Sequence, residues 1–197
     1  DLRPHGRVEA PAALDAKYRA AFVDFGIDVG GVDVTTAAQV IRADRARDAL
    51  VDGLDDWMWM QRRHRVPDAN AWRRTIDLAL GADDDALRQQ VREAVRADDA
   101  QRLLEIAAVD AIANEPARSL VLLARGLAES EHRDEAIRVY RIASFRHPDD
   151  MRLSHDLAAQ LGLLDNPPLE EITRLYSMAL AVRPDDAHVM TDLGRAL

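Results

Sequence analysis

The last third of the sequence carries a spacing of small and large apolar residues that is typical of closely packed helix pairs. In a frame of about 34 residues that starts at Ala117, positions 4, 7, 8, 11, 20, 24, 27 and 32 are Leu120, Leu123, Ala124, Leu127, Ala136, Tyr140, Ala143 and Pro148. Small residues at positions 8, 20 and 27 let neighbouring helices approach closely, and the larger residues fill the spaces between them. The pattern therefore predicts two antiparallel helices.

The same pattern returns at residues 151–186 and begins a third time at residues 187–197. The second copy has Ser154, Leu157, Ala158, Leu161, Ile172, Tyr176, Ala179 and Pro184, and the third has Met190, Leu193, Gly194 and Leu197. Pro148 and Pro184 lie 36 residues apart because the turn "DNPPLEE" lengthens the second copy. The pattern resembles tetratricopeptide repeats. We therefore expect an all-α fold, a right-handed α-α superhelix, with repeats at 117–150 and 151–186 and a truncated third at 187–197, all within region 116–197.

Residues 1–115 also show helical periodicity, but without a regular repeat. A first helix is predicted to end at Gly26, with Ile27 packing back on Phe22. Its apolar face is Leu14, Tyr18, Phe22 and Phe25. Asp33 is expected to cap the next helix. This region is therefore interpreted as irregular helices, and the sequence leaves open whether they stack as degenerate helix pairs.

A longer helix is predicted over residues 45–63, and its apolar stripe contains the first tryptophan. The stripe is Ala46, Ala49, Leu50, Leu54, Trp57, Met58 and Gln61. Trp57 and Trp72 are expected in the core, whereas Trp59 either packs on a second element or marks a contact surface. A helix stop at Pro67, an N-cap at Asp68 and a helix end at Gly81 are also expected.

Composition excludes several classes of function. The formal net charge of −9 argues against nucleic acid and against an anionic membrane surface as partners. The absence of cysteine excludes disulfides, zinc–thiolate sites and thiol catalysis. No apolar run is long enough to insert into a bilayer. The six histidines lack metal-binding spacing, and Asp83, Asp84 and Asp85 lack calcium-loop spacing and read as helix N-terminal charge. We expect no metal and no cofactor.

Two triplets match protein-kinase motifs, but their order is wrong for a kinase. Asp24-Phe25-Gly26 precedes His132-Arg133-Asp134, although the catalytic loop of a kinase comes first. Val139 stands where that loop needs asparagine, and Lys17 is the sole lysine of the chain. We therefore expect no catalytic residue here and interpret the triplets as a helix end and as a turn in which Asp134 caps a helix.

The first helices of the predicted repeats offer a binding surface instead, because stacked helix pairs present these helices on a concave face. The candidate groove residues are Arg118, Val121, Arg125, Arg152, His155 and Ala159. Their cations predict a local basic patch that binds a carboxylate-bearing peptide. The alternative is a solvated face whose charges pair within the molecule. The truncated third repeat would expose an apolar face, which predicts self-association.

Five stretches resemble the C-terminal helical region of planctomycete-type serine/threonine protein kinases. They are "YRAAFVDFGIDV", "AAQVIRADRARDALVDGLDDWMWMQRR", "SLVLLARGLAES", "RIASFRHPDD" and "ALAVRPDDAHVMTDLGRAL". The resemblance implies a regulatory, non-catalytic region of a longer signalling kinase, anchored in a membrane by a segment N-terminal to this chain. It gives no compartment for the chain itself.

From the sequence we expect a protein-interaction or scaffolding module that binds a protein or peptide. The chain begins at Asp1 and ends at "TDLGRAL", and we expect it to be a fragment of a larger protein. The alternative function is a helical enzyme domain that senses a small molecule or a nucleotide. Nucleotide binding in the presence of magnesium separates the two hypotheses.

Overall fold

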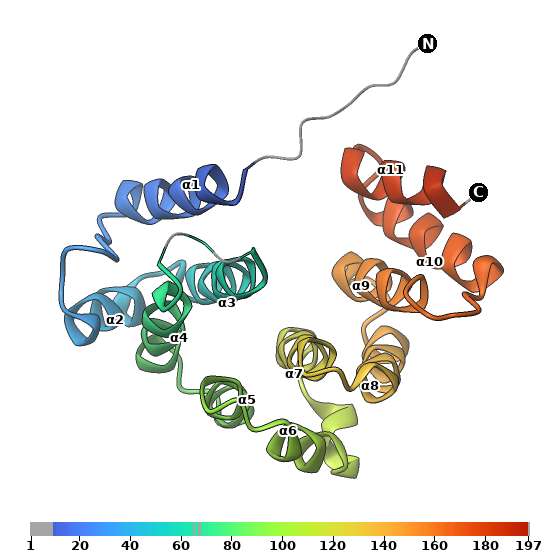
Figure 1. Ribbon diagram of the computed structural model, residues 1–197, viewed down its shortest axis with the longest axis horizontal. Coiled ribbons are helices and arrows are strands. Elements are labelled where there is room, and N and C mark those ends of the chain that lie inside the picture. Colours follow the sequence, from blue (N-terminus) through green and yellow to red (C-terminus); the bar gives the residue numbers. More distant parts are fainter. Residues whose placement is uncertain (1–9, 65, 67, 197) are drawn as a thin grey trace. The chain divides into compact units, whose positions relative to one another are not determined.

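A computed structural model describes residues 10–64, 66 and 68–196. Within these residues all regular structure is helical, with eleven α-helices and one short 3-10 helix (Figure 1). The predicted all-α class is therefore confirmed. The chain separates into two compact units, residues 1–92 and residues 93–197, so the regular helix pairs predicted from residue 117 lie wholly in the second unit.

The first unit contains four complete helices and most of a fifth. These are α1 (Pro11–Asp24), α2 (Val34–Ala43), α3 (Arg47–His64), α4 (Ala71–Ala82) and α5 (Ala86–Arg96), whose last four residues belong to the second unit. Helix α4 packs against both α2 and α3, and α1 packs against α3. The pattern that predicted a helix over residues 45–63 therefore corresponds to α3.

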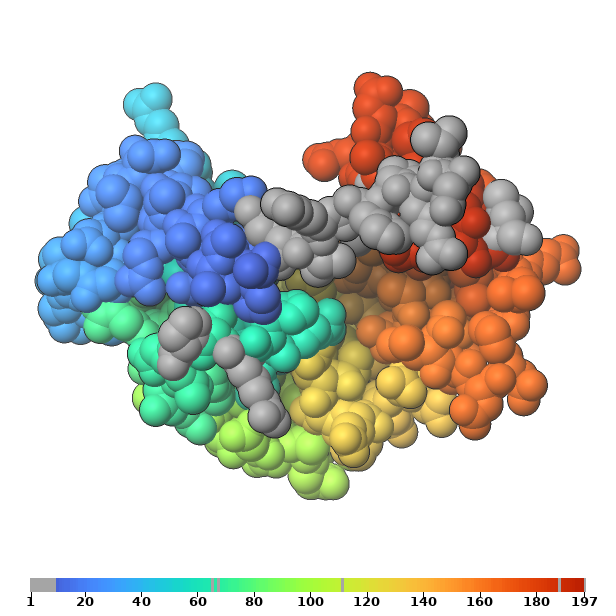
Figure 2. All heavy atoms as spheres, turned by 45° about the horizontal axis from the view of Figure 1, so that its top comes forward, coloured from blue at the N-terminus to red at the C-terminus, as the bar shows by residue number. Residues whose placement is uncertain are grey.

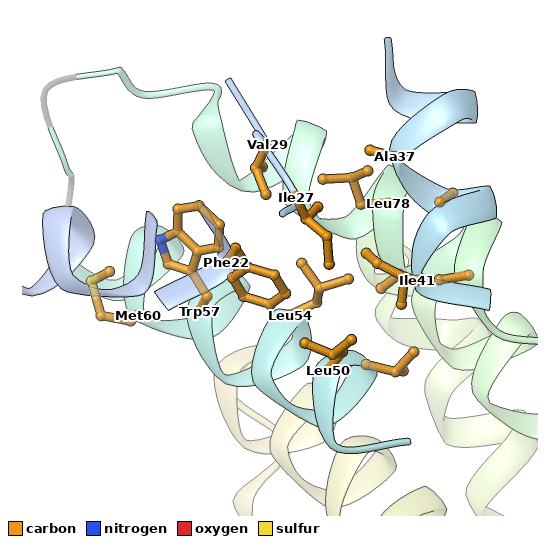
Figure 3. Close-up of a cluster of buried hydrophobic side chains, with 14 of the residues drawn as sticks. Phe22, Ile27, Val29, Ala37, Ile41, Leu50, Leu54, Trp57, Met60 and Leu78 are labelled. Atoms are coloured by element: carbon orange, nitrogen blue, oxygen red, sulfur yellow. The ribbon is translucent and has the colours of Figure 1, made fainter. Parts of the chain in front are cut away.

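Trp57 is the central side chain of the first core. Its indole stacks on Phe22 with ring centroids 5.5 Å apart and on Tyr18 at 6.0 Å; Figure 3 shows Phe22 against the indole. The indole nitrogen Nε1 donates a hydrogen bond to Asp15 Oδ1 at 2.8 Å. Trp57 is 1% exposed, which confirms its predicted place in the core.

The other predictions for α3 and its surroundings have mixed outcomes. Trp72 is buried as predicted, and Trp59 is buried too, which settles its packing in favour of the interior. Ala49 is exposed, so its place on the apolar stripe was wrong. Pro67 lies outside the described residues.

Gly26 ends α1 in the predicted way. Its φ is +78°, and the amides of Gly26 and Ile27 donate to the carbonyls of Val23 (2.8 Å) and Phe22 (2.9 Å). These two bonds form a Schellman motif, and Ile27 and Phe22 are both buried. Phe25, by contrast, is 57% exposed, so its predicted place on the buried face was wrong. As the C-cap of α1, it has already left the helical face.

Two predicted helix boundaries around α4 were wrong. Asp68 accepts a hydrogen bond from the amide of Asn70 (2.9 Å) and so closes the turn before the helix, while Asn70 is the N-cap. Gly81 lies inside α4 rather than after it. A Cβ at Gly81 would stand 2.7 Å from the Cβ of Ala38, so glycine is needed there for the close approach of α2 and α4. Asp33 does cap α2, by accepting from the Thr36 amide at 2.9 Å.

The second unit consists of helices that pack on their neighbours in sequence. They are α6 (Ala100–Ala107), η1 (Asp110–Asn114), α7 (Ala117–Glu129), α8 (Arg133–Arg146), α9 (Met151–Leu161), α10 (Leu169–Val182) and α11 (Ala187–Ala196). Helix α7 pairs with α8 and α9 with α10, while α8 packs on α9 and α10 on α11. The small residues of the first pair, Ala124, Ala136 and Ala143, have no exposed surface, as close helix approach requires.

Three details of the second unit differ from the sequence prediction or from common helix ends. Asp134 lies in the first turn of α8 and not at its N-cap, which is His132. In α11, Met190 is 54% exposed and Val189 is buried instead, so the predicted buried position was wrong by one residue. Finally, Glu131, in the turn that follows α7, has φ +67°, a left-handed conformation that glycine usually supplies.

Within the described part of the chain, none of the helices combines the length and the apolarity that crossing a bilayer requires.

We expect the Gly26→Ala variant to lose about 1 kcal/mol of unfolding free energy, because an L-residue resists the left-handed conformation. A Cβ at Gly26 would meet nothing within 4 Å, so the loss would be purely conformational. The control is Gly194→Ala in α11, which also has open space around it but an ordinary helical backbone, where alanine should stabilise by up to about 1 kcal/mol. Urea unfolding of both variants measures this; equal changes would contradict it.

Candidate functional site

The predicted groove residues lie on α7 and α9, the first helices of two successive helix pairs. The two pairs pack on each other. Helix α7 carries Arg118, Val121 and Arg125, and α9 carries Arg152, His155 and Ala159. Val121 is buried, whereas Arg125 and Arg152 keep 31% and 46% of their side-chain surface exposed. We give the name first-helix face to seven ionisable side chains of α7, α9 and α11, namely Arg118, Arg125, Arg152, His155, Asp156, Asp192 and Arg195.

Two of the predicted cations pair with carboxylates of the same chain. Arg125 Nη2 lies 3.1 Å from Asp156 Oδ2 and so links α7 to α9. Arg152 Nη2 lies 2.8 Å from Asp150 Oδ2, and Asp150 is also the N-cap of α9 and accepts from the Arg152 amide. Both arginines therefore agree with the alternative stated above, in which the charges of this surface pair within the molecule.

His155 stands between two carboxylates. Its Nδ1 lies 3.3 Å from Asp156 Oδ1, and its Nε2 lies 3.2 Å from Asp192 Oδ2 on α11. The ring of Tyr176 packs against the imidazole, with centroids 5.6 Å apart. The hydrogen bond with Asp156 raises the pKa of His155 above its ordinary value, against the opposing effect of partial burial.

Asp156 is the centre of this network. Burial alone would raise its pKa, but hydrogen bonding and charge from His155 and Arg125 hold the pKa below the ordinary value. The Tyr140 hydroxyl donates to Asp156 Oδ2 at 3.4 Å. Burial and the Asp156 charge raise the pKa of Tyr140 well above its ordinary value. The carboxylate is thus ionised and bound from three helices.

The two carboxylates were missed by sequence reasoning, although the sequence carried a signal for them. Asp156 and Asp192 are both the sixth residue of a predicted repeat copy, 36 residues apart. Each is contacted by a basic side chain from the preceding helix pair: Arg125 reaches Asp156, and His155 reaches Asp192. A recurring acidic position would have predicted this inter-repeat pairing.

A separate ionic cluster lies inside the first unit. Arg92 has no exposed side-chain surface and binds Asp55 through both carboxylate oxygens, at 2.9 and 2.7 Å. Its Nη1 also lies 2.7 Å from Asp83 Oδ2, and Arg88 Nε lies 2.5 Å from the same oxygen. Burial would raise the pKa of Asp83, but hydrogen bonds from Arg88 and Arg92 place it far below the ordinary value.

This cluster changes the interpretation of the acidic run before α5. Asp85 does serve the helix start, because its side chain accepts from the Arg88 amide at 2.8 Å. Asp83 instead binds Arg92 of α5, and Arg92 also binds Asp55 of α3. Helical periodicity could not predict this pairing, since Asp55 lies 37 residues before Arg92.

The chemistry of both the first-helix face and the Arg92 cluster is ion pairing. Among the described residues, no group of three histidine, aspartate or glutamate side chains is arranged to hold a metal ion. The first-helix face presents ordered charges that can exchange an internal partner for an external one. Arg152 also lines an open hollow of about 400 Å³ with Asp149, Asp150, Met151, Val182 and Arg183.

A scan against protein-family models finds no match for this chain, and a search of curated proteins finds none either.

We expect Arg92→Met to lose roughly 3 to 5 kcal/mol of unfolding free energy, because it removes the cation shared by buried Asp83 and partly buried Asp55. Arg96→Met is the control, since Arg96 is exposed on the same helix and should change stability by less than about 1 kcal/mol. Denaturant unfolding at neutral pH measures both variants. Similar losses for the two would show that the buried cluster contributes little.

In the second unit, Arg125→Glu should lose about 2 kcal/mol or more, because it places a second carboxylate beside ionised Asp156. Arg152→Glu should lose less than about 1 kcal/mol, because Arg152 is half-exposed and Asp150 keeps its bond to the α9 backbone. Thermal unfolding of the two variants under the same conditions tests the difference. The reverse order would contradict the geometry described above.

Proposed function

We propose that the chain is a non-catalytic protein-interaction module that binds a protein or peptide through the first-helix face. The observation that supports this is the exposure pattern of α7 and α9. Their apolar residues, such as Leu120, Leu123 and Leu157, are almost completely buried, while Arg125 and Arg152 keep a substantial part of their surface. Helical hairpins with a charged, accessible first helix suit recognition of a partner by side chains.

Arg152 is the group on this face best suited to a partner carboxylate. Its carboxylate neighbour, Asp150, already accepts a backbone hydrogen bond, and the arginine itself is the more exposed of the paired groove arginines. A ligand carboxylate can therefore replace Asp150 with little rearrangement. Arg125 and His155 are bound to Asp156, and their proposed role is to hold the face in shape.

We further propose that the module belongs to a bacterial serine/threonine protein kinase. The support is the resemblance of the five stretches quoted above, which include "YRAAFVDFGIDV". In such a parent, the module would bring a partner or a second kinase molecule to the catalytic domain.

The test is capture by the immobilised chain, in three forms: native, Arg152→Glu and Arg174→Glu. Arg174 is exposed on α10, is not one of the residues of the first-helix face, and serves as the matched control. We expect a peptide array to yield acidic sequences that bind the native chain and the Arg174 variant. The Arg152 variant should bind them at least about tenfold more weakly, which corresponds to one charge-assisted hydrogen bond.

Two outcomes contradict this proposal. If both variants lose the same peptides equally, the first-helix face is the wrong surface. If the native chain binds magnesium–ATP in calorimetry, the alternative of a nucleotide-sensing domain replaces the interaction module. Circular dichroism of each variant establishes that the helices are intact before binding is compared.

A further inference from the structure

His155 connects two helices through both nitrogens of one ring. Nδ1 faces Asp156 on its own helix α9, and Nε2 faces Asp192 on α11. A neutral imidazole carries a single N–H, so it can donate only one of these hydrogen bonds. Both contacts are favourable together only when the ring carries two protons.

We propose that His155 is a proton-dependent clasp that holds α11 against α9. The clasp is closed when the imidazole is doubly protonated and bridges the two carboxylates. It opens when the ring loses one proton, because one carboxylate then faces a nitrogen lone pair.

The surroundings decide which of the two contacts is lost. Asp156 is adjacent to His155 in sequence and is also bound by Arg125 and Tyr140, so its position does not depend on the histidine. Asp192 is bound by Arg195, three residues away on α11. Loss of the proton therefore breaks the His155–Asp192 contact between α9 and α11, while the contact of Arg125 on α7 with Asp156 on α9 remains.

The other ionisable groups around the ring lie on five helices. They are Arg125 on α7, Tyr140 on α8, Asp156 on α9, Tyr176 on α10, and Asp192 and Arg195 on α11. Burial raises the pKa of both tyrosines, and the pKa of Asp156 is lowered. In the range where an imidazole titrates, these tyrosines are neutral and this aspartate is charged.

The pH dependence follows from the direction of the His155 shift. The folded state raises the pKa of His155 above its unfolded value, so its contribution is complete below the ordinary imidazole range. The contribution is lost as the pH rises through the raised pKa. The clasp is therefore closed in mildly acidic solution and opens on the alkaline side.

Opening uncovers a surface that is buried in the closed state. Helix α11 packs on α10, as the red and orange atoms in Figure 2 illustrate. Val189 and Tyr176 are 1% and 6% exposed. Release of α11 would expose Val189 on α11 and Tyr176 on α10. The second unit would then gain an apolar surface whose availability depends on pH.

Hydrogen exchange of the intact chain tests the clasp. The measured quantity is the protection of the α11 amides relative to those of α7, corrected for the intrinsic exchange rate, at about pH 6 and about pH 9. In the native chain we expect relative protection of α11 to fall about tenfold at the higher pH, as for loss of one charge-assisted hydrogen bond. His155→Gln should show low α11 protection at both values, without the pH dependence.

Asp192→Asn and His132→Gln complete the experiment. Asp192→Asn removes the other half of the clasp and should also abolish the pH dependence, which keeps the test decisive if His155→Gln folds poorly. His132 makes no side-chain capping bond in its turn, so His132→Gln should keep the native profile. Unchanged α11 protection across the pH range in the native chain, or an equal fall in Asp192→Asn, would overturn the proposal.

Discussion

Close approach of helices at small side chains is the constraint on which the rest of each unit depends. In the second unit Ala124, Ala136 and Ala143 are completely buried at the crossings of α7 and α8 with their neighbours. In the first unit Gly81 meets Ala38 at a distance that leaves no room for another Cβ. These contacts fix the spacing of the helix axes, and the spacing in turn brings charged side chains of neighbouring helices within hydrogen-bonding distance.

The charged groups that this spacing brings together are arranged differently in the two units. In the first unit Arg92 is enclosed by carboxylates of α3 and of the segment before α5, so its charge is compensated inside the core. In the second unit the charges form a chain along α7, α9 and α11 that stays partly accessible to water. Removing one partner from a buried, compensated cluster is strongly destabilising, whereas charges that stay accessible to water lose less when a partner is removed.

Local features could be predicted from the sequence because they depend on neighbouring residues alone. The left-handed end of α1 at Gly26 and the cap of α2 at Asp33 are examples. Gly81 could not be interpreted correctly, because its role depends on Ala38, which lies in another helix. The cations of the candidate site were found through their repeat positions, but their carboxylates were missed. Asp156 and Asp192 pair with side chains of other helices. The periodicity of a single helix carries no information about such pairs.

The distribution of aromatic residues gives the two units separate optical reporters. All three tryptophans of the chain, Trp57, Trp59 and Trp72, lie in the first unit and are buried there. The second unit holds two of the three tyrosines, Tyr140 and Tyr176, and no tryptophan. Tryptophan emission therefore follows unfolding of the first unit alone, while far-ultraviolet circular dichroism follows the helices of both. Any separation between the two signals measures how independently the units unfold.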